Sequence, residues 1–360
     1  MYKAKLKDES IVVDENPEEV FQVGGYGKIE GELLILEPVE AMNLIQRGKL
    51  EIEDDEGSLD EEEFYRKACK LVENFHERLL VYQDLRNRGF VVRPGHSFPC
   101  DLRVYERGVS FDKDEKKLKH VKWLLDVVRT DSEFSLKEKS EKLGSAKNIR
   151  SGLALGIVDE EGDVTYYEVE EEGRLNDDFE GDMKGTEHAE GFLEDNTVIV
   201  WKDMDSIYEP MYFGKKRKGR VELNLIEAVF LLKKKKLTVV SQGKEVGVGE
   251  LKERGRGVDI EFDKKYEIYE DLREKGFLVK CGFKFGTHFR VYDRGVELKR
   301  GQKNPDEHTK WVVHAVNRDS KWSYPELSRF VRLALNIRSK PTLGVVDGNK
   351  KYYRIRRIKP

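Results

Sequence analysis

The chain has 360 residues, of which 38% are hydrophobic and 38% are charged, and its formal net charge is −4. This length allows two or three domains, and the apolar share suffices for packed cores. The sequence shows no apolar run near the ~18 residues of a membrane span, no signal-peptide core and no closely paired cysteines, so we expect a soluble protein of the reducing cytoplasm without a membrane partner.

Apolar residues recur at helical spacing from Phe64 to Leu79, and Gly89 is expected to end this helix. The stretches that follow predict further short elements. In chain order these are strands at residues 90–92, 102–105 and 121–128, a helix at 135–147, and strands at 153–158 and 164–169. This order predicts a mixed α/β unit, in which helices flank a small sheet.

The second half of the chain repeats the first. "VYQDLRNRGFVVRPG" (residues 81–95) matches "IYEDLREKGFLVKCG" (residues 268–282), which begins 187 residues later. "NIRSGLALGIVD" and "NIRSKPTLGVVD" are identical at 8 of 12 positions, and "LEPVEAMNLIQRGKL" has a counterpart in "LNLIEAVFLLKKKKL". The period is too long for a solenoid. The chain is therefore expected to be a tandem duplication of a two-part module.

We expect four domains from this duplication. They are a small unit at residues 1–55, a larger unit at 60–172, a second small unit at 180–250 and a second larger unit at 258–360. The acidic, glycine-containing residues 170–185 are expected to link the two copies. Ser323 is expected to cap a helix with Pro325 in its first turn.

The chain contains no P-loop, HExxH or GxSxG motif. Its acidic runs at residues 51–57 and 60–63 are more typical of solvated surface or a helix N-terminus than of a metal site. His308 and His314 have no evident third ligand. We expect neither a metal nor a cofactor.

Three reactive side chains remain in the second copy, each at the end of a predicted element. Tyr292 ends a strand, His308 opens the next strand after the polar residues 297–307, and Lys340 follows a helix. Functional residues tend to lie at such positions. A tyrosine at a strand end is more often packing, however, and a lone histidine more often a surface residue, so the pattern alone leaves both interpretations open.

Three stretches, "GFKFGTHFRVYDRG", "EHTKWVVHAV" and "RLALNIRSKPTLGVVD", together resemble the archaeal tRNA-splicing endonucleases, and the resemblance covers nearly the whole chain. The tandem layout is similar to the duplicated, homodimeric class of that family. The resemblance implies a small N-terminal unit and a restriction-endonuclease-like nuclease unit in each copy. It also implies metal-independent cleavage of precursor tRNA at bulge–helix–bulge junctions, which leaves 2′,3′-cyclic phosphate and 5′-hydroxyl ends.

The resemblance assigns roles to the three candidates. Tyr292 would be the base, His308 the acid and Lys340 the cation that stabilises the charged phosphorane. In the alignment the lysine position of the family falls on Ser339, one residue before Lys340, so a small backbone shift would be needed.

The first copy has the same framework without the lysine. It keeps Tyr105 and His120 but has Gly152 at the position of Lys340, so we expect it to be catalytically degenerate.

RNA binding is expected near the basic, tyrosine-containing C-terminal tail. By resemblance, Arg332 and Arg357 would clamp a flipped base. An acidic loop of the first copy would dock on the partner subunit of a homodimer, although it fits an ordinary charged turn as well. This loop contains Asp159, Glu160, Glu161 and Asp163.

Two other functions were weighed. A non-catalytic RNA-binding or scaffolding subunit is favoured by the serine at position 339. A DNA nuclease would need clustered carboxylates for metal ions, which the second copy does not show.

Overall fold

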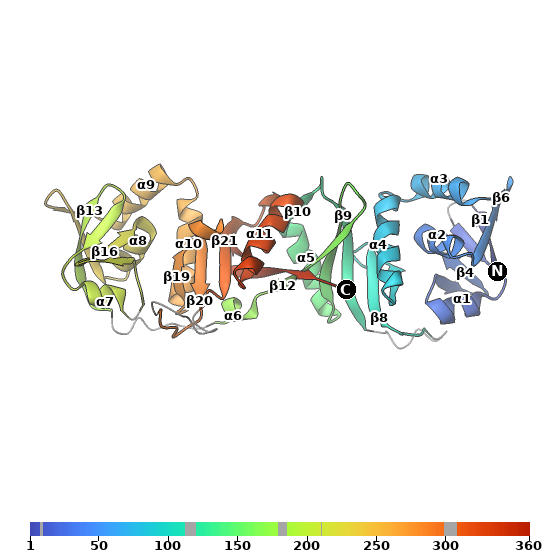
Figure 1. The fold of residues 1–360 in the computed structure, drawn as a ribbon, viewed down its shortest axis with the longest axis horizontal. Helices are drawn as coiled ribbons and strands as arrows, with labels where there is room; N and C mark the ends of the chain where they lie inside the picture. Colours follow the sequence, from blue (N-terminus) through green and yellow to red (C-terminus); the bar gives the residue numbers. More distant parts are fainter. Residues whose placement is uncertain (8–9, 112–119, 179–185, 210, 299–307) are drawn as a thin grey trace. The chain divides into compact units, whose positions relative to one another are not determined.

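The computed structural model describes residues 1–360 except 8–9, 112–119, 179–185, 210 and 299–307 (Figure 1). The chain forms two compact units. The first comprises Met1–Glu170 with Lys321–Leu327 and Arg356–Pro360, and the second comprises Glu171–Ser320 with Ser328–Ile355. None of the helices in these described parts is long and apolar enough to cross a membrane.

Each copy begins with a small domain built around a mixed sheet. In the first copy the strand order is β3-β4-β2-β1-β5-β6, and in the second it is β15-β16-β14-β13-β17-β18. The elements of the first small domain are β1 (Tyr2–Lys7), β2 (Ser10–Val13), α1 (Pro17–Gly24), β3 (Lys28–Glu30), β4 (Leu33–Leu36), α2 (Pro38–Gln46), β5 (Leu50–Asp54), β6 (Gly57–Leu59) and α3 (Glu61–Leu71). Those of the second are β13 (Ala189–Glu194), β14 (Thr197–Val200), α7 (Met204–Tyr208), β15 (Lys215–Arg217), β16 (Arg220–Asn224), α8 (Leu225–Lys233), β17 (Leu237–Ser241), β18 (Lys244–Glu245) and α9 (Val248–Val258).

A larger domain follows each small one. Its strands lie in the order β7-β8-β9-β11-β12 in the first copy and β19-β20-β21-β23-β24 in the second. The first comprises α4 (Phe75–Asn87), β7 (Phe90–Pro94), β8 (Leu102–Arg107), β9 (Val121–Arg129), β10 (Glu133–Ser135), α5 (Leu136–Asn148), β11 (Gly152–Val158) and β12 (Val164–Glu171), and α6 (Gly173–Asn176) comes next. The second comprises α10 (Phe262–Glu274), β19 (Leu278–Cys281), the 3₁₀ turn Phe283–Phe285, β20 (Phe289–Tyr292), β21 (Trp311–Asn317), β22 (Lys321–Ser323), α11 (Tyr324–Asn336), β23 (Lys340–Val346) and β24 (Lys351–Ile358).

The structure confirms the mixed α/β class and the duplicated order of elements. The predicted strands and the helix near residues 135–147 are present, with ends that differ by one to two residues. Ser323 caps α11, because its hydroxyl accepts from the Glu326 amide at 3.3 Å. The predicted domain limits stay predictions, and residues 179–185 of the expected linker lie outside the described residues.

The single helix expected from Phe64 to Gly89 is wrong. The chain leaves α3 at Val72, which is extended (φ −126°, ψ 122°), and it enters α4 after Asn74, whose φ is +53°. Asparagine tolerates this left-handed conformation better than most residues. In the second copy Asp259 is also extended (φ −140°) between α9 and α10. Helical spacing therefore identified the buried residues but not the break between two helices.

A buried arginine joins the small and large domains of each copy. Arg273 is fully buried, and its guanidinium donates to the carbonyl oxygens of Met211 and Val279, both at 2.9 Å. Arg86 makes the matching bonds to Gly24 and Val92 at 2.6 and 2.7 Å. Each guanidinium thus satisfies carbonyls of two domains that no apolar side chain could satisfy.

A second duplicated bond ties the last strand to the long helix. The Tyr166 hydroxyl donates to Asp84 at 2.7 Å, and the Tyr352 hydroxyl donates to Asp271 at 2.6 Å. Hydrogen bonds to a charged acceptor are stronger than neutral ones. The last strand of each copy is therefore fixed against the helix that precedes the sheet.

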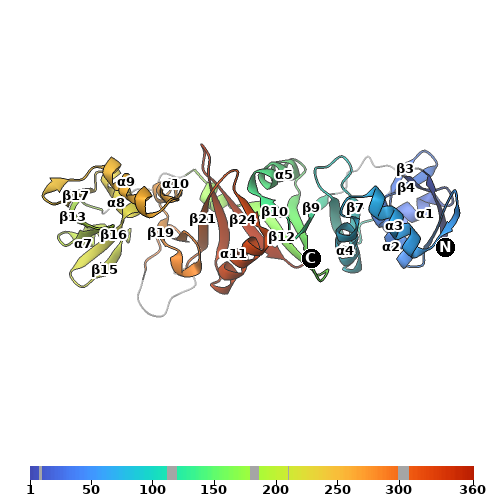
Figure 2. The same ribbon diagram turned by 90° about the horizontal axis from the view of Figure 1, so that it is seen from above.

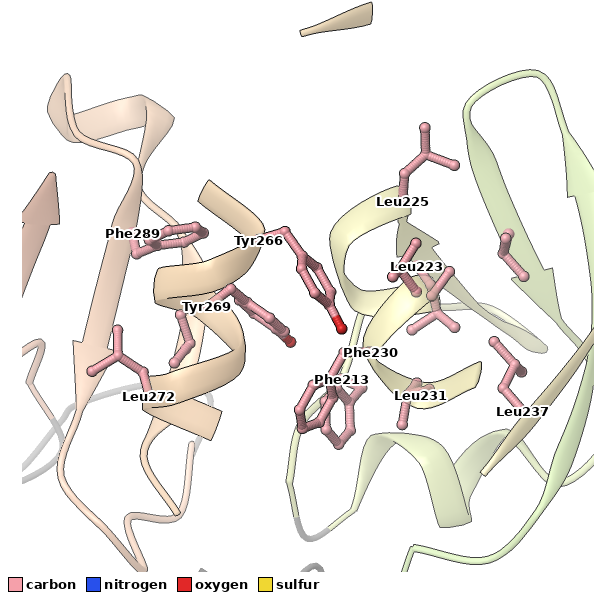
Figure 3. Close-up of a cluster of buried hydrophobic side chains, with 14 of the residues drawn as sticks. Phe213, Leu223, Leu225, Phe230, Leu231, Leu237, Tyr266, Tyr269, Leu272 and Phe289 are labelled. Carbon is pink, nitrogen blue, oxygen red and sulfur yellow. The ribbon is translucent and has the colours of Figure 1, made fainter. Parts of the chain in front are cut away.

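Helix α10 packs beside α8 of the second small domain (Figure 2), and aromatic side chains fill the contact between them. In Figure 3, Tyr266 and Tyr269 of α10 point towards Phe213 and Phe230 of the small domain. The ring centroids of Phe230 and Tyr269 lie 5.8 Å apart at 85°, an edge-to-face arrangement. The core of the second small domain therefore continues into the large domain of the same copy.

One pair of core residues differs in charge between the two copies. In the second copy His288 and His314 stack with ring centroids 3.7 Å apart, and the His288 Nδ1 accepts from the Ala315 amide at 3.1 Å. In the first copy the equivalent residues are Asp101 and Asp126. The acids are compensated by cations: Arg78 lies 2.6 Å from Asp101, and Lys139 and Lys142 lie 2.7 and 2.8 Å from Asp126.

The histidines are instead kept neutral. Burial and the neighbouring ring of His314 lower the pKa of His288 to about 3, and burial lowers the pKa of His314 to about 4. The charged groups that face them are Glu261, Lys264 and Lys265. Because protonation is disfavoured in the folded state, unfolding at mildly acidic pH takes up protons.

The pair predicts a pH dependence of stability. The stability that depends on these two histidines being neutral is fully present above pH 6.5. It is lost as pH falls from 6.5 towards about 4, where the free energy of unfolding should decrease by at most about 2.7 kcal/mol per pH unit for two histidines. The urea concentration at the unfolding midpoint should change less with pH across that range in a His288→Asn/His314→Asn variant than in the parent protein. His188→Asn, which changes an exposed histidine, is the control. Parallel pH profiles for the double variant and the parent protein would contradict this account.

Candidate active site

Three strand ends meet at one edge of the second large domain. β20 and β21 lie side by side (Figure 1) and are antiparallel, with Val291 opposite Trp311. β21 runs parallel to β23, with Trp311 opposite Lys340. The last residue of β20 therefore lies beside the first residues of β21 and β23. These positions are Tyr292, Trp311 and Lys340. The pairing brings the candidates to one edge although they are far apart in the sequence.

His308 does not open β21, as the sequence predicted. The strand begins at Trp311, and His308 is an exposed residue in the approach to it. Thr309 and Lys310 lie between them, and their backbone is held by the neighbouring strands: the Thr309 carbonyl accepts from Ser339, and the Lys310 amide donates to Val291. Residues 299–307 lie outside the described residues.

Tyr292 is only 2% exposed, and a cation lies at its hydroxyl group. One guanidinium nitrogen of Arg290 is 3.5 Å from the Tyr292 hydroxyl oxygen. Arg290 is held there, because its Nε donates to the Cys281 carbonyl at 2.9 Å and its guanidinium lies 5.4 Å from the Phe285 ring centre. The sequence analysis missed Arg290, although "RVY" occurs in both copies.

Ser339 is part of the framework. Its side chain is 4% exposed, and its hydroxyl donates to the Thr309 carbonyl at 2.7 Å. Ser151 in the first copy makes the equivalent bond to Val121 at 2.6 Å. The serine that precedes Lys340 and its counterpart before Gly152 therefore fix the start of a strand in both copies.

Lys340 is partly exposed and paired. Its ammonium lies 3.3 Å from both carboxylate oxygens of Glu172 and 5.6 Å from the Trp311 ring centre. Glu172, whose side chain is 7% exposed, is a further residue that the sequence analysis missed, because nothing links it to Lys340 before the chain folds.

Strand alternation separates the lysine from the tyrosine. Val291, Trp311 and Lys340 are register partners and share one face of the sheet. Tyr292 follows Val291 and therefore faces the other side. The structure brings Tyr292, His308 and Lys340 to the same edge, but it does not place the tyrosine and lysine side chains on the same face.

The edge is rich in positive charge. Asp293, next to Tyr292, pairs with Lys310 and lies 3.2 Å from Arg174. Partial burial alone would raise the pKa of Asp293, but the hydrogen bonds from Lys310 and Arg174 hold that pKa below its ordinary value. Five cations lie at this edge: Arg174, Arg290, Arg294, Lys310 and Lys340. Asp293 and Glu172 pair with three of these cations, so positive charge is in excess at the edge, which suits an anionic ligand such as a phosphodiester.

The first copy fills the corresponding space differently. Tyr105 is 3% exposed and packs edge-to-face on Phe111 at 5.1 Å. A Cβ atom on Gly152 would lie 2.7 Å from a carboxylate oxygen of Glu168 and 2.8 Å from Trp123. A side chain at this position, where the second copy has Lys340, would therefore require Glu168 and Trp123 to shift.

The remaining candidates lie elsewhere. Arg332 is exposed on α11 and belongs to the second unit, whereas Arg357 is exposed on β24 and belongs to the first. The acidic residues 159–163 form an exposed turn. The Asp159 carboxylate accepts from the amides of Glu161 and Asp163 at 3.0 and 2.9 Å, which fixes the shape of the turn.

Family models match both halves of both copies. The tRNA intron endonuclease N-terminal domain matches residues 2–65 and 189–252, and the tRNA intron endonuclease catalytic C-terminal domain matches residues 75–166 and 262–353. The chain belongs to the tRNA intron endonuclease family. It is an enzyme of that family, with both domains duplicated.

Relatives of this endonuclease fall into two sizes. The tRNA-splicing endonucleases of Methanococcoides burtonii and Methanosarcina barkeri are 32% and 33% identical to it, over 98% and 99% of both chains. That of Thermococcus onnurineus is 38% identical over 160 residues, which are 44% of this chain and 88% of the relative. One copy of the duplicated module thus corresponds to nearly the whole of the shorter relative.

The packing at Gly152 predicts that a single lysine substitution does not give the first copy an active site. Gly152→Ala should destabilise the protein by about 1–3 kcal/mol, because the new methyl group meets Glu168 and Trp123. Gly152→Lys should be at least as damaging and should not make the first copy active in a Lys340→Ala background. Urea unfolding and a cleavage assay check both outcomes, with Gly144→Ala, at an uncrowded helical site, as control. A stable Gly152→Lys/Lys340→Ala protein that cleaves RNA would contradict this prediction.

Proposed function

We propose that this enzyme cleaves precursor tRNA at intron boundaries within bulge–helix–bulge junctions, without a metal ion. Family membership supports tRNA as the substrate class. The observation that carries the chemistry is the edge where Tyr292, His308 and a cluster of cations meet. The predicted products carry 2′,3′-cyclic phosphate and 5′-hydroxyl ends.

In the proposed reaction the 2′-oxygen attacks the adjacent phosphorus, and the bond from phosphorus to the 5′-oxygen breaks. Tyr292, acting as the phenolate, takes the 2′-hydroxyl proton and becomes the neutral phenol, and Arg290 supplies positive charge at that oxygen. The exposed imidazole of His308 gives a proton to the leaving 5′-oxygen. The proton count balances, since one proton is taken up and one is released.

Lys340 is proposed to stabilise the negative charge of the phosphorane, and Glu172 is proposed to position Lys340. The carboxylate holds the ammonium at the strand edge in the free enzyme. A fixed cation near the reacting phosphate is usually a large catalytic contribution. RNA phosphates would then compete with Glu172 for the ammonium group.

Cleavage of an intron-containing precursor tRNA in excess chelator tests this proposal. The parent enzyme should yield cyclic-phosphate ends. His308→Ala should lower the single-turnover rate by about 10²–10⁴. Lys340→Ala should lower it by at least about 100-fold. In both variants RNA affinity should stay within about twofold, and Lys233→Ala, which removes another lysine paired with a glutamate, should cleave normally.

Other outcomes separate the alternatives. Full activity of Lys340→Ala would remove the lysine from the mechanism. RNA binding without any cleavage by the parent protein would favour a non-catalytic RNA-binding or scaffolding subunit, for which the buried Ser339 is the supporting observation.

We further propose that the enzyme is a homodimer that acts on RNA rather than DNA in the cytoplasm. The three cysteines are unpaired, as suits a reducing compartment. The acidic turn supports the dimer, because Asp159 fixes its backbone while the carboxylates of Glu160, Glu161 and Asp163 are exposed. Arg332 and Arg357 are proposed to hold an unstacked base of the junction.

The dimer proposal predicts that Glu160→Lys/Glu161→Lys shifts the protein from dimer to monomer in moderate salt, because the docking charge is reversed. Sedimentation velocity measures this. Glu51→Lys/Glu53→Lys changes the same charge on an exposed strand of the small domain and should stay dimeric. A parent protein that sediments as a monomer and still cleaves RNA would disprove the dimer.

A further inference from the structure

A cavity of about 590 Å³ lies in the first unit, at the place that corresponds to the candidate active site of the second copy. Its walls come from β7, β8, β9 and the C-terminal tail. They include Phe90, Arg107, Lys122, Trp123, Arg357 and Lys359. The counterparts of the first four residues are Phe277, Arg294, Lys310 and Trp311, which surround the edge described above. The first copy therefore has a hollow at the positions that correspond to the candidate active site of the second copy.

The cavity carries a surplus of positive charge. Lys122 is neutralised by Glu106 at 3.0 Å, and Arg356 is neutralised by Glu168. Arg107, Arg357 and Lys359 have no acidic partner among the described residues. Three cations on one hollow exceed what structural ion pairing requires, and such a field attracts phosphate groups.

Gly152 explains how the tail reaches this cavity. Because position 152 has no side chain, Glu168 fits between Trp123 and the tail: its carboxylate accepts from the Trp123 indole at 3.3 Å and also binds Arg356. Arg356 is thereby anchored at a glutamate whose side chain is 12% exposed. The anchor holds the following residues of the tail at the rim of the cavity.

Arg107 is positioned to bind a ligand and not a backbone carbonyl group. In the second copy the equivalent Arg294 donates to the Lys275 carbonyl at 2.7 Å. Arg107 is exposed, and its guanidinium lies over the face of Phe90, 4.8 Å from the ring centre. Stacking on an aromatic ring leaves the guanidinium N–H groups available to bind phosphate oxygens.

We propose that this cavity binds backbone phosphates of the RNA substrate, so that the copy that lost its lysine serves as a second contact for the RNA. The inference rests on the proposed function for the identity of the RNA. It assigns the binding to Arg107 and Lys359, with Arg356 as the anchor of the tail. The chemistry remains in the second copy.

The test compares two double variants with equal loss of charge. Arg107→Gln/Lys359→Gln alters the cavity, and Lys3→Gln/Lys7→Gln alters an exposed strand of the first small domain. The probe is precursor tRNA with 2′-deoxynucleotides at both cleavage sites, which cannot be cut. Fluorescence anisotropy gives the dissociation constant at several salt concentrations, and urea unfolding confirms that both variants are folded.

The cavity variant should bind the RNA about tenfold more weakly than the parent protein. The slope of the logarithm of the association constant against the logarithm of the salt concentration should become less steep by about 1.4–1.8, the value for two lost phosphate contacts. The control should match the parent protein. An unchanged affinity and slope, or an equal loss in the control, would overturn the proposal. A parent enzyme that does not cut unmodified precursor tRNA would refute the proposed function instead, and the binding comparison would still decide this inference.

Discussion

The parallel pairing of β21 with β23 is the constraint on which the site depends. It sets Trp311 opposite Lys340 and, with β20 on the other side of β21, brings three strand ends to one edge. The same register directs Lys340 towards Glu172 and leaves Tyr292 beside Arg290 on the other face. A shift of one residue would exchange these faces, because side chains alternate along a strand. The bond from Ser339 to Thr309 opposes such a shift at the point where it would matter.

The two copies keep one framework and differ in what they place on it. Buried arginines and the tyrosine–aspartate bond of the last strand occur in both copies at matching positions. The core pair beneath the sheet is two compensated aspartates in the first copy and two neutral histidines in the second. At the edge, the first copy has Gly152 with Glu168 packed over it, whereas the second copy has Lys340 at the same position. Duplication thus preserved the bonds that define the fold and released the edge residues to diverge.

The sequence alone predicted the repeated order of elements, because apolar periodicity and internal matches are properties of the chain itself. It missed the break at Asn74, since helical spacing continues across one turn of changed backbone. The sequence identified Tyr292, His308 and Lys340 as candidates. The face of the sheet on which a strand side chain lies, however, depends on strand register, which no local pattern contains. Glu172 and Arg290 were missed for related reasons: one meets Lys340 only across 168 residues of chain, and the other has no distinguishing motif.

The central claim is that the second copy carries out the reaction while the first supplies framework and contacts. Single-turnover cleavage of precursor tRNA by Tyr105→Phe and Tyr292→Phe tests it directly, because each variant removes one hydroxyl group from equivalent buried positions. The account predicts a rate within about twofold of the parent enzyme for Tyr105→Phe and at least about 100 times lower for Tyr292→Phe. Equal losses in both variants, or a loss confined to Tyr105→Phe, would contradict it.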